Sequence, residues 1–156
     1  MDPLAIKGGP KAKATPYNRP NKYDEEERTL LQEVLDSGKL MGPVGKVADF
    51  EAEVAQAFGV NHTVMVTSGT AALHTALAAL GVSEGDEVIT TSMTDFGTTS
   101  AILALHAVPV FADIDLDTRL LSPESVREKI TDRTRVIITV HMAGMPCDLD
   151  PFLALS

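Results

Sequence analysis

The fold is decided by one continuous stretch, Val64-Met65-Val66-Thr67-Ser68-Gly69-Thr70-Ala71-Ala72-Leu73-His74-Thr75-Ala76-Leu77. Residues 64–67 are uncharged and rich in β-branched side chains, which predicts a buried strand, and the Ala- and Leu-rich residues 70–80 predict a helix. Ser68, Gly69 and Thr70 therefore stand where a strand becomes a helix. There the first N–H groups of the helix lack partners, and the helix dipole favours an anion. These three residues also fit an ordinary N-cap, so both interpretations stay open at this point.

From residue 64 onward, strand and helix patterns alternate. The periodicity predicts strands at 64–67, 87–91, 109–112 and 135–140, and helices at 70–80, 98–106, 123–130 and from residue 148 onward. Such alternation predicts an α/β fold, in which a mainly parallel sheet lies between two helical layers in a three-layer α-β-α arrangement. Before it, we expect an extended arm over 1–22 and helices at Asp24–Ser37 and Val44–Phe58.

Four polar residues fall just past the ends of the predicted strands. Because ligands of such sheets gather beyond the carboxyl ends of the strands, these residues are candidates for a site. They are Ser68, Thr94, Asp113 and His141.

Composition excludes several classes of protein. The chain has 156 residues, a net charge of −9 and one cysteine, Cys147. The acidic balance argues against nucleic acid as a partner, and no apolar run approaches the ~20 residues of a membrane span. The lone cysteine and the absence of an apolar signal core near the N-terminus favour a cytoplasmic protein.

Common catalytic and metal motifs are absent or incomplete. The sequence contains no Gly-x-Gly-x-x-Gly and no P-loop, and Thr67-Ser68-Gly69 is not the Gly-x-Ser-x-Gly turn of a nucleophilic serine. Asp113, Asp115 and Asp117 invite a metal hypothesis and resemble the Asp-x-Asp motif of haloacid-dehalogenase-like phosphatases, but Thr118 stands where a calcium loop needs Gly. A solvated acidic loop is the favoured interpretation. The histidines share no ligand spacing, so we predict no metal site; among them only His141 is a candidate, either structural or functional.

Five motifs, in one order and spacing, resemble the opening of the DegT/DnrJ/EryC1/StrS family of sugar aminotransferases over roughly residues 20–151. Each motif is weak alone, but the ordered set is specific. They are Gly42-Pro43 with Phe50-Glu51, Thr67–Leu73, Gly85–Thr90, Pro109–Asp115, and Val140-His141-x-x-Gly144-x-Pro146.

This resemblance implies a type I pyridoxal-phosphate fold and a homodimer that transfers an amino group, typically from glutamate, to a nucleotide-linked keto-sugar. Carried over by position, Gly69, Thr70 and Ala71 would hold the phosphate of pyridoxal 5′-phosphate, which favours the anion-site interpretation over the simple cap. It also implies that residues 1–46 form an arm and entry helix, and that 47–156 form the N-terminal part of the large domain.

Two departures from the family pattern concern the cofactor. Relatives have Thr-aromatic where Thr94-Asp95 stands, so either Asp95 lies at the cofactor or Phe96 supplies the ring. The lysine that carries the cofactor lies, in the family, after the segment that matches residues 20–151. We therefore expect an N-terminal portion that contains no catalytic residue and does not transaminate alone. The alternative is a non-catalytic α/β binding or regulatory domain that retains the fold.

Overall fold

The computed structural model describes residues 3–16, 22–42 and 44–155, which pack as two units, Met1–Thr63 and Val64–Ser156. The first unit holds a short 3-10 helix, η1 (Ala5–Lys7), and the helices α1 (Glu25–Ser37) and α2 (Lys46–Phe58). Of the predicted arm, residues 1–2 and 17–21 lie outside the described residues, as does Pro43 in the loop after α1.

The two helices of the first unit confirm the local patterns. Asp24 caps α1 through a capping box, because its carboxylate accepts from Glu26 N at 2.9 Å and its own N–H donates to Glu27 Oε2 at 2.7 Å. An ion pair of 3.0 Å joins Glu33 of α1 to Lys46 of α2, and this hydrogen bond raises the pKa of Lys46 above its usual value. None of the described residues of either helix is buried.

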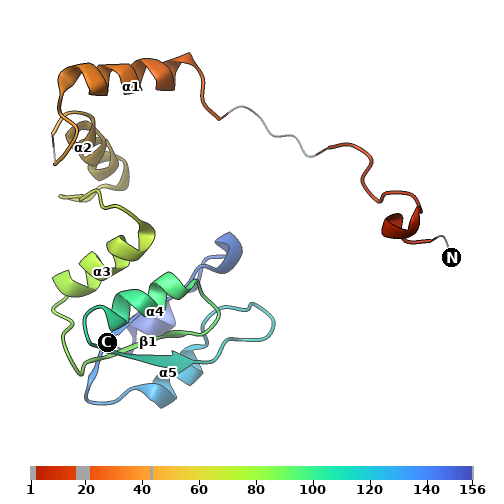
Figure 1. Ribbon diagram of the computed structural model, residues 1–156. Helices are drawn as coiled ribbons and strands as arrows, with labels where there is room; N and C mark the ends of the chain where they lie inside the picture. The colour runs from red at the N-terminus through yellow and green to blue at the C-terminus, as the bar shows by residue number, and fades with distance from the viewer. Residues whose placement is uncertain (1–2, 17–21, 43, 156) are drawn as a thin grey trace. The chain divides into compact units, whose positions relative to one another are not determined.

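The second unit is built on a parallel sheet with strand order β2-β1-β3. Figure 1 labels its central strand, β1. Its strands are β1 (Glu87–Thr91), β2 (Val108–Ala112) and β3 (Thr134–Ile137). The helices are α3 (Gly69–Ala79), α4 (Phe96–Leu103), α5 (Pro123–Lys129) and α6 (Asp150–Leu153), and η2 (Met142–Gly144) is a 3-10 turn. The α/β prediction is confirmed. All five residues of the central strand β1 are buried.

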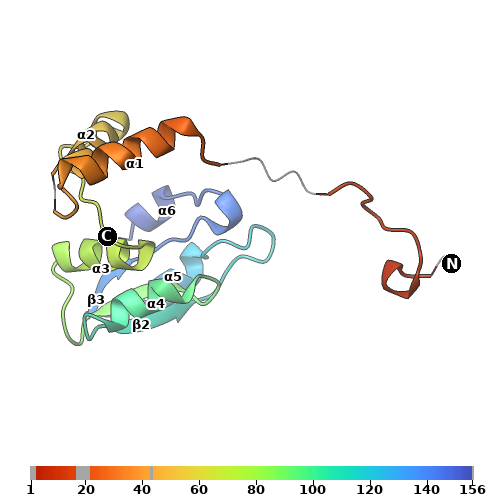
Figure 2. The ribbon, with the colours of Figure 1, turned by 45° about the horizontal axis from the view of Figure 1, so that its top comes forward.

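Side chains that alternate along β1 serve two separate cores, one on each face of the sheet. Figure 2 shows the ribbon of the sheet and its helices from a second direction. Val88 faces helices α3 and α4, and the next residue, Ile89, faces α5 and α6. The first core is built from Leu77, Val82, Val88, Ala101, Ile102 and Ala107. The second is built from Ile89, Ala112, Leu121, Val126 and Phe152. The sheet is therefore covered by helices on both faces, as the sequence pattern predicted.

The strand predicted at 64–67 is wrong. This segment has no regular secondary structure, and Val64 and Met65 are 70% and 49% exposed. A strand needs a hydrogen-bonded neighbour, and none of the three strands in the described part of the chain pairs with this segment. Its apolar composition indicated burial, but composition alone does not supply a partner.

Smaller differences affect the ends of elements. Helix α4 begins at Phe96, two residues before the prediction, because Asp95 caps it. Strand β3 ends at Ile137, although Ile138 N still donates to Ile89 O at 2.8 Å. Helix α6 begins at Asp150, where we expected a start near residue 148.

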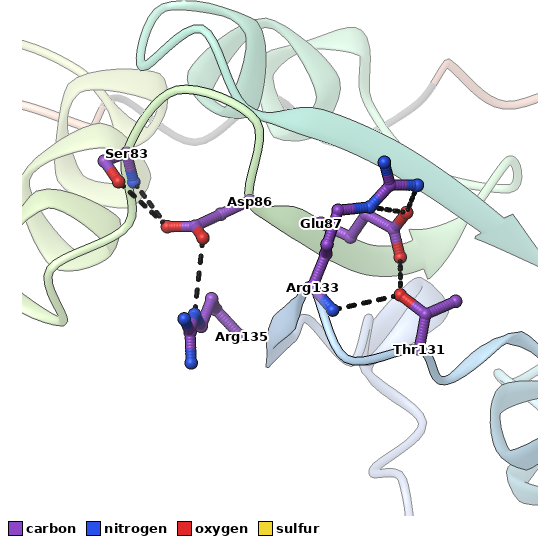
Figure 3. A network of polar contacts seen from close by, with 6 residues as sticks. All are labelled: Ser83, Asp86, Glu87, Thr131, Arg133 and Arg135. Atoms are coloured by element: carbon purple, nitrogen blue, oxygen red, sulfur yellow. Dashed lines mark hydrogen bonds and ion pairs between the residues drawn. The ribbon is translucent and has the colours of Figure 1, made fainter.

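A polar clamp fixes the amino edge of the sheet (Figure 3). Glu87, the first residue of β1, is only 4% exposed. Its Oε2 accepts from Thr131 Oγ1 at 2.6 Å, and its Oε1 accepts from Arg133 Nε at 3.0 Å and Nη2 at 2.5 Å. The Thr131 hydroxyl, followed by Arg133, lowers the pKa of the Glu87 carboxyl. The buried charge is thus fully partnered by the segment that leads into β3.

A second carboxylate beside it completes the attachment of β3. Asp86 accepts from Ser83 N at 2.9 Å, from Ser83 Oγ at 3.1 Å and from Arg135 Nε at 3.3 Å. The Ser83 backbone N–H is the main cause of the lowered pKa of Asp86. The β1–β3 register shifts beside Glu87, whose partner is Thr134 while Val88 pairs with Val136, so Arg135 is the extra residue. The two acids therefore hold both sides of this irregularity.

We predict that the clamp makes the second unit sensitive to acid. Because the folded-state pKa of Glu87 lies below the usual ~4.3 of glutamate, the charged carboxylate stabilises the fold at neutral pH, and this contribution is lost as the pH falls through and below that value. Urea unfolding between about pH 6 and pH 3 should show a steeper loss of unfolding free energy for the unmodified chain than for Glu87→Gln.

The matched control is Glu84→Gln, which changes an exposed carboxylate in the neighbouring turn and should keep the full pH dependence. An unchanged pH dependence in Glu87→Gln would show that the clamp contributes no linked stability.

Candidate functional site

The N-terminus of α3 is formed by a serine cap. Ser68 has extended backbone angles (φ −165°, ψ 166°), and its Oγ accepts from Ala71 N at 3.1 Å. This is the arrangement by which a short hydroxyl side chain replaces the missing partner of one helix N–H. Helix α3 therefore begins at Gly69, close to the predicted start.

Ser68 satisfies only one of the three amides predicted to bind an anion. The N–H of Ala71 is taken by the cap, whereas within the described residues nothing accepts the N–H of Gly69 or of Thr70. Both residues are exposed, and a methyl group on Gly69 would meet no atom within 4 Å. Two unpartnered donors, from residues that are both exposed, thus lie at the positive end of a helix dipole.

A second helix N-terminus meets the first at this place. Helices α3 and α4 pack together, and a methyl group on Gly97 would lie 2.5 Å from Thr70 Oγ1 and 2.8 Å from Asp95 Oδ1. Both distances are shorter than atoms normally approach, so the hydroxyl of Thr70 and the first turn of α4 are neighbours. The sequence did not single out Gly97; a small residue two positions after a capping Asp was the available signal.

Asp95 and Phe96, the two candidates for the cofactor ring, stand at the start of α4. Asp95 Oδ1 accepts from Gly97 N at 2.7 Å, so this carboxylate caps α4. Phe96, the first residue of α4, is 72% exposed. Behind them, Thr94 Oγ1 lies 2.9 Å from Thr98 Oγ1, which fixes the turn between β1 and α4.

The other candidates follow the neighbouring strands. Asp113 comes directly after β2, and its N–H donates to Ser125 Oγ at 2.9 Å. His141 lies beyond β3, and its Nδ1 accepts from Cys147 N at 3.0 Å. Parallel strands end at one edge, so the topology gives these residues and the start of α4 a common edge of the sheet.

The acidic loop after β2 has a structural explanation. Asp115 Oδ1 accepts from Asp117 N at 3.1 Å, from Thr118 N at 2.8 Å and from Thr118 Oγ1 at 2.9 Å. The Thr118 backbone N–H is the main cause of the lowered pKa of Asp115. Among the described residues, no group of three His, Cys, Asp or Glu side chains is placed to hold a metal ion. The phosphatase alternative therefore gains no support from this loop.

Within residues 64–155, no lysine lies at the edge of the sheet that carries these candidates. The single lysine of residues 64–155 is Lys129, which ends α5 shortly before β3 begins, and hence lies toward the amino edge of the sheet.

Within the described part of the chain, no helix is both long and apolar enough to cross a membrane.

Comparisons with known proteins fit this geometry. The family model described as DegT/DnrJ/EryC1/StrS aminotransferase family matches residues 21–156. The structure of 3-amino-5-hydroxybenzoic acid synthase is 39% identical, with a TM-score of 0.84 over 92% of this chain and 38% of that one. DesV from S. venezuelae is 39% identical, with a TM-score of 0.79 over 84% of this chain and 35% of its own. NtdA from Bacillus subtilis, solved with bound cofactor PMP, is 31% identical, with a TM-score of 0.80 over 84% of this chain and 30% of its own.

The structure is thus a three-layer α/β unit whose open helix N-terminus lies beside a second one. By its match to the family model and to these structures, the chain belongs to the DegT/DnrJ/EryC1/StrS aminotransferase family. It spans 30–38% of the length of the three solved structures named above.

We predict that the serine cap contributes measurably to stability. Replacing Ser68 with Ala removes the acceptor for Ala71 N and should lower the free energy of unfolding by about 1 kcal/mol in urea titrations. Thr75→Ala, at an exposed position within the same helix, removes no cap and should leave this free energy unchanged or raise it by up to about 0.7 kcal/mol, because Ala has the higher helix propensity. Equal effects of the two substitutions would contradict the capping role.

Proposed function

We propose that this chain forms the cofactor-phosphate site of an aminotransferase that uses pyridoxal 5′-phosphate. The observation that supports it most is the pair of unpartnered N–H groups of the exposed residues Gly69 and Thr70 at the start of α3. In this proposal Ala71 contributes through the geometry of the turn, since its N–H already donates to Ser68 Oγ.

The donors present suit a phosphate group. Two backbone N–H groups and the Thr70 hydroxyl lie at the positive end of α3, where an anion is stabilised. The carboxylate of Asp95 accepts from the N–H of Gly97 and so caps its own helix. The residues therefore fit the phosphate of the cofactor.

The remaining residues of the site would orient the cofactor ring. Pyridoxal phosphate supplies a carbonyl that carries the amino group and a ring that withdraws electrons. Phe96 is the exposed aromatic side chain beside the anion site and would cover one face of that ring. Asp95 would act indirectly, by fixing the first turn of α4. Amino transfer also needs a lysine that moves protons, and none of residues 64–155 supplies a lysine at this edge of the sheet. In this proposal the lysine is therefore contributed by residues outside 64–155.

For the complete protein we propose transfer of an amino group from glutamate to a nucleotide-linked keto-sugar by a cytoplasmic homodimer. Membership of the family supports amino transfer. The sugar substrate, the glutamate donor, the dimer and the cytoplasmic location are proposed from the sequence alone. A non-catalytic domain that retains the fold is the alternative.

Binding of pyridoxamine 5′-phosphate to the chain tests the proposal without requiring a lysine. Equilibrium dialysis should show tighter binding of pyridoxamine 5′-phosphate than of pyridoxamine, because only the former carries the anion. Thr70→Val, which removes one donor while keeping the volume, should weaken binding about tenfold.

Thr75→Val is the matched control, because it makes the same change in the same helix at an exposed position beyond the first turn. Equal affinity for the phosphorylated and unphosphorylated compounds would contradict a phosphate site. Amino transfer is tested on the longest product of the gene: 2-oxoglutarate should form from glutamate when a nucleotide-linked keto-sugar is added, and binding without turnover would favour the non-catalytic alternative.

A further inference from the structure

The loop that follows β3 is closed by one residue, Cys147. Its backbone N–H donates to His141 Nδ1 at 3.0 Å, and its buried thiol donates to Val140 O at 3.3 Å. Between them the chain makes a tight reversal in which Ala143 (φ 51°) and Gly144 (φ 84°) both have left-handed backbones. The loop therefore holds His141 by a specific contact with its ring.

That contact decides which nitrogen of the imidazole carries the proton. A neutral imidazole has one N–H donor and one acceptor nitrogen, and a backbone N–H bonds only to the acceptor. Because Nδ1 of His141 accepts from Cys147, the proton of the neutral ring lies on Nε2. The side chain is exposed, and no partner for Nε2 lies among the described residues. Nε2–H is thus an unused donor.

The start of the loop is fixed against β1, the strand that leads into the turn before α4. Ile138 N donates to Ile89 O at 2.8 Å, and Thr90 Oγ1 donates to Ile138 O at 3.1 Å. These bonds continue the pairing of β1 with β3 beyond Ile137, so the segments that follow the two strands leave the sheet side by side. Strand β1 leads into the turn that carries Asp95, and β3 leads into the loop that carries His141.

We propose that His141 is a ligand-binding residue whose Nε2–H, held in this tautomer by the Cys147 backbone, donates to an oxygen acceptor of the compound whose phosphate binds at Gly69 and Thr70. This inference rests on the proposed function, since it assumes an anionic compound at the start of α3. It adds that the two ring nitrogens of His141 have different roles: Nδ1 accepts from the Cys147 backbone, and Nε2 donates to the bound compound.

The tautomer is tested first and without any ligand. Long-range ¹H–¹⁵N correlation spectra of the chain labelled with ¹⁵N-histidine, recorded at about pH 8 where free histidine is neutral, should show His141 protonated on Nε2 alone. Cys147→Ala keeps the backbone N–H and should leave this pattern unchanged. A ring protonated on Nδ1, or an even mixture of the two tautomers, would overturn the inference.

The donor role is tested with two substitutions that separate the two nitrogens. In His141→Asn the side-chain oxygen lies near the Nδ1 position, so it can accept from Cys147 N while the outer donor is lost. This variant should keep the slow exchange of the Cys147 amide but bind pyridoxamine 5′-phosphate about tenfold more weakly. His141→Ala should lose both the amide protection and the affinity. His106→Asn, at an exposed position with φ 56° that Asn tolerates, should change neither.

Amide spectra distinguish failure of this inference from failure of the proposed function. Pyridoxamine 5′-phosphate should shift the amide signals of Gly69 and Thr70 together with the Nε2 signal of His141. Shifts at Gly69 and Thr70 with an unmoved His141 and an unweakened His141→Asn would overturn the donor role alone. No shift at Gly69 and Thr70 would overturn the proposed phosphate site itself.

Discussion

A helix cannot satisfy the N–H groups of its own first turn, and the candidate site depends on that limit. In α3 the serine cap takes one of these groups, and the two N–H groups before it remain without a partner in the described residues. Because Gly69 has no side chain and nothing lies close to it, an anion can approach the backbone itself. The cap and the proposed anion site can therefore coexist in the same residues, and the two interpretations of the sequence are compatible.

The two edges of the sheet differ in how fully their polar groups are partnered. At the amino edge, Glu87 and Asp86 are partnered by groups from the loop before β3, from β3 itself and from the turn before β1. At the carboxyl edge, the backbone turns into helix starts and short loops whose donors are less fully used. The parallel pairing of β1 with both neighbours produces this difference. In a parallel sheet the connections that leave the strands all start at the carboxyl edge, and the connections that enter them all end at the amino edge.

Local patterns predicted local structure well. Helix α1 could be placed because its start and its end are both marked in the local sequence, by Asp24 with the following acids and by Gly38. Strand β1 could be placed because the run Glu87–Thr91 has the local pattern of a strand. The failed strand at 64–67 shows the limit, since a strand depends on a partner that is often distant in the chain. The approach of Gly97 to Thr70 and the bond from Cys147 to His141 are likewise products of tertiary packing and of a specific turn. The cap at Asp95 was detectable, because Asp is a favoured N-cap residue, but the helix pattern suggested a later start.

The most direct test of this account is a crystal structure of the chain with pyridoxamine 5′-phosphate bound. The account predicts that the phosphate oxygens lie within hydrogen-bond distance of the N–H groups of Gly69 and Thr70, at the start of α3. A phosphate bound elsewhere, with these two amides turned toward protein acceptors, would contradict it.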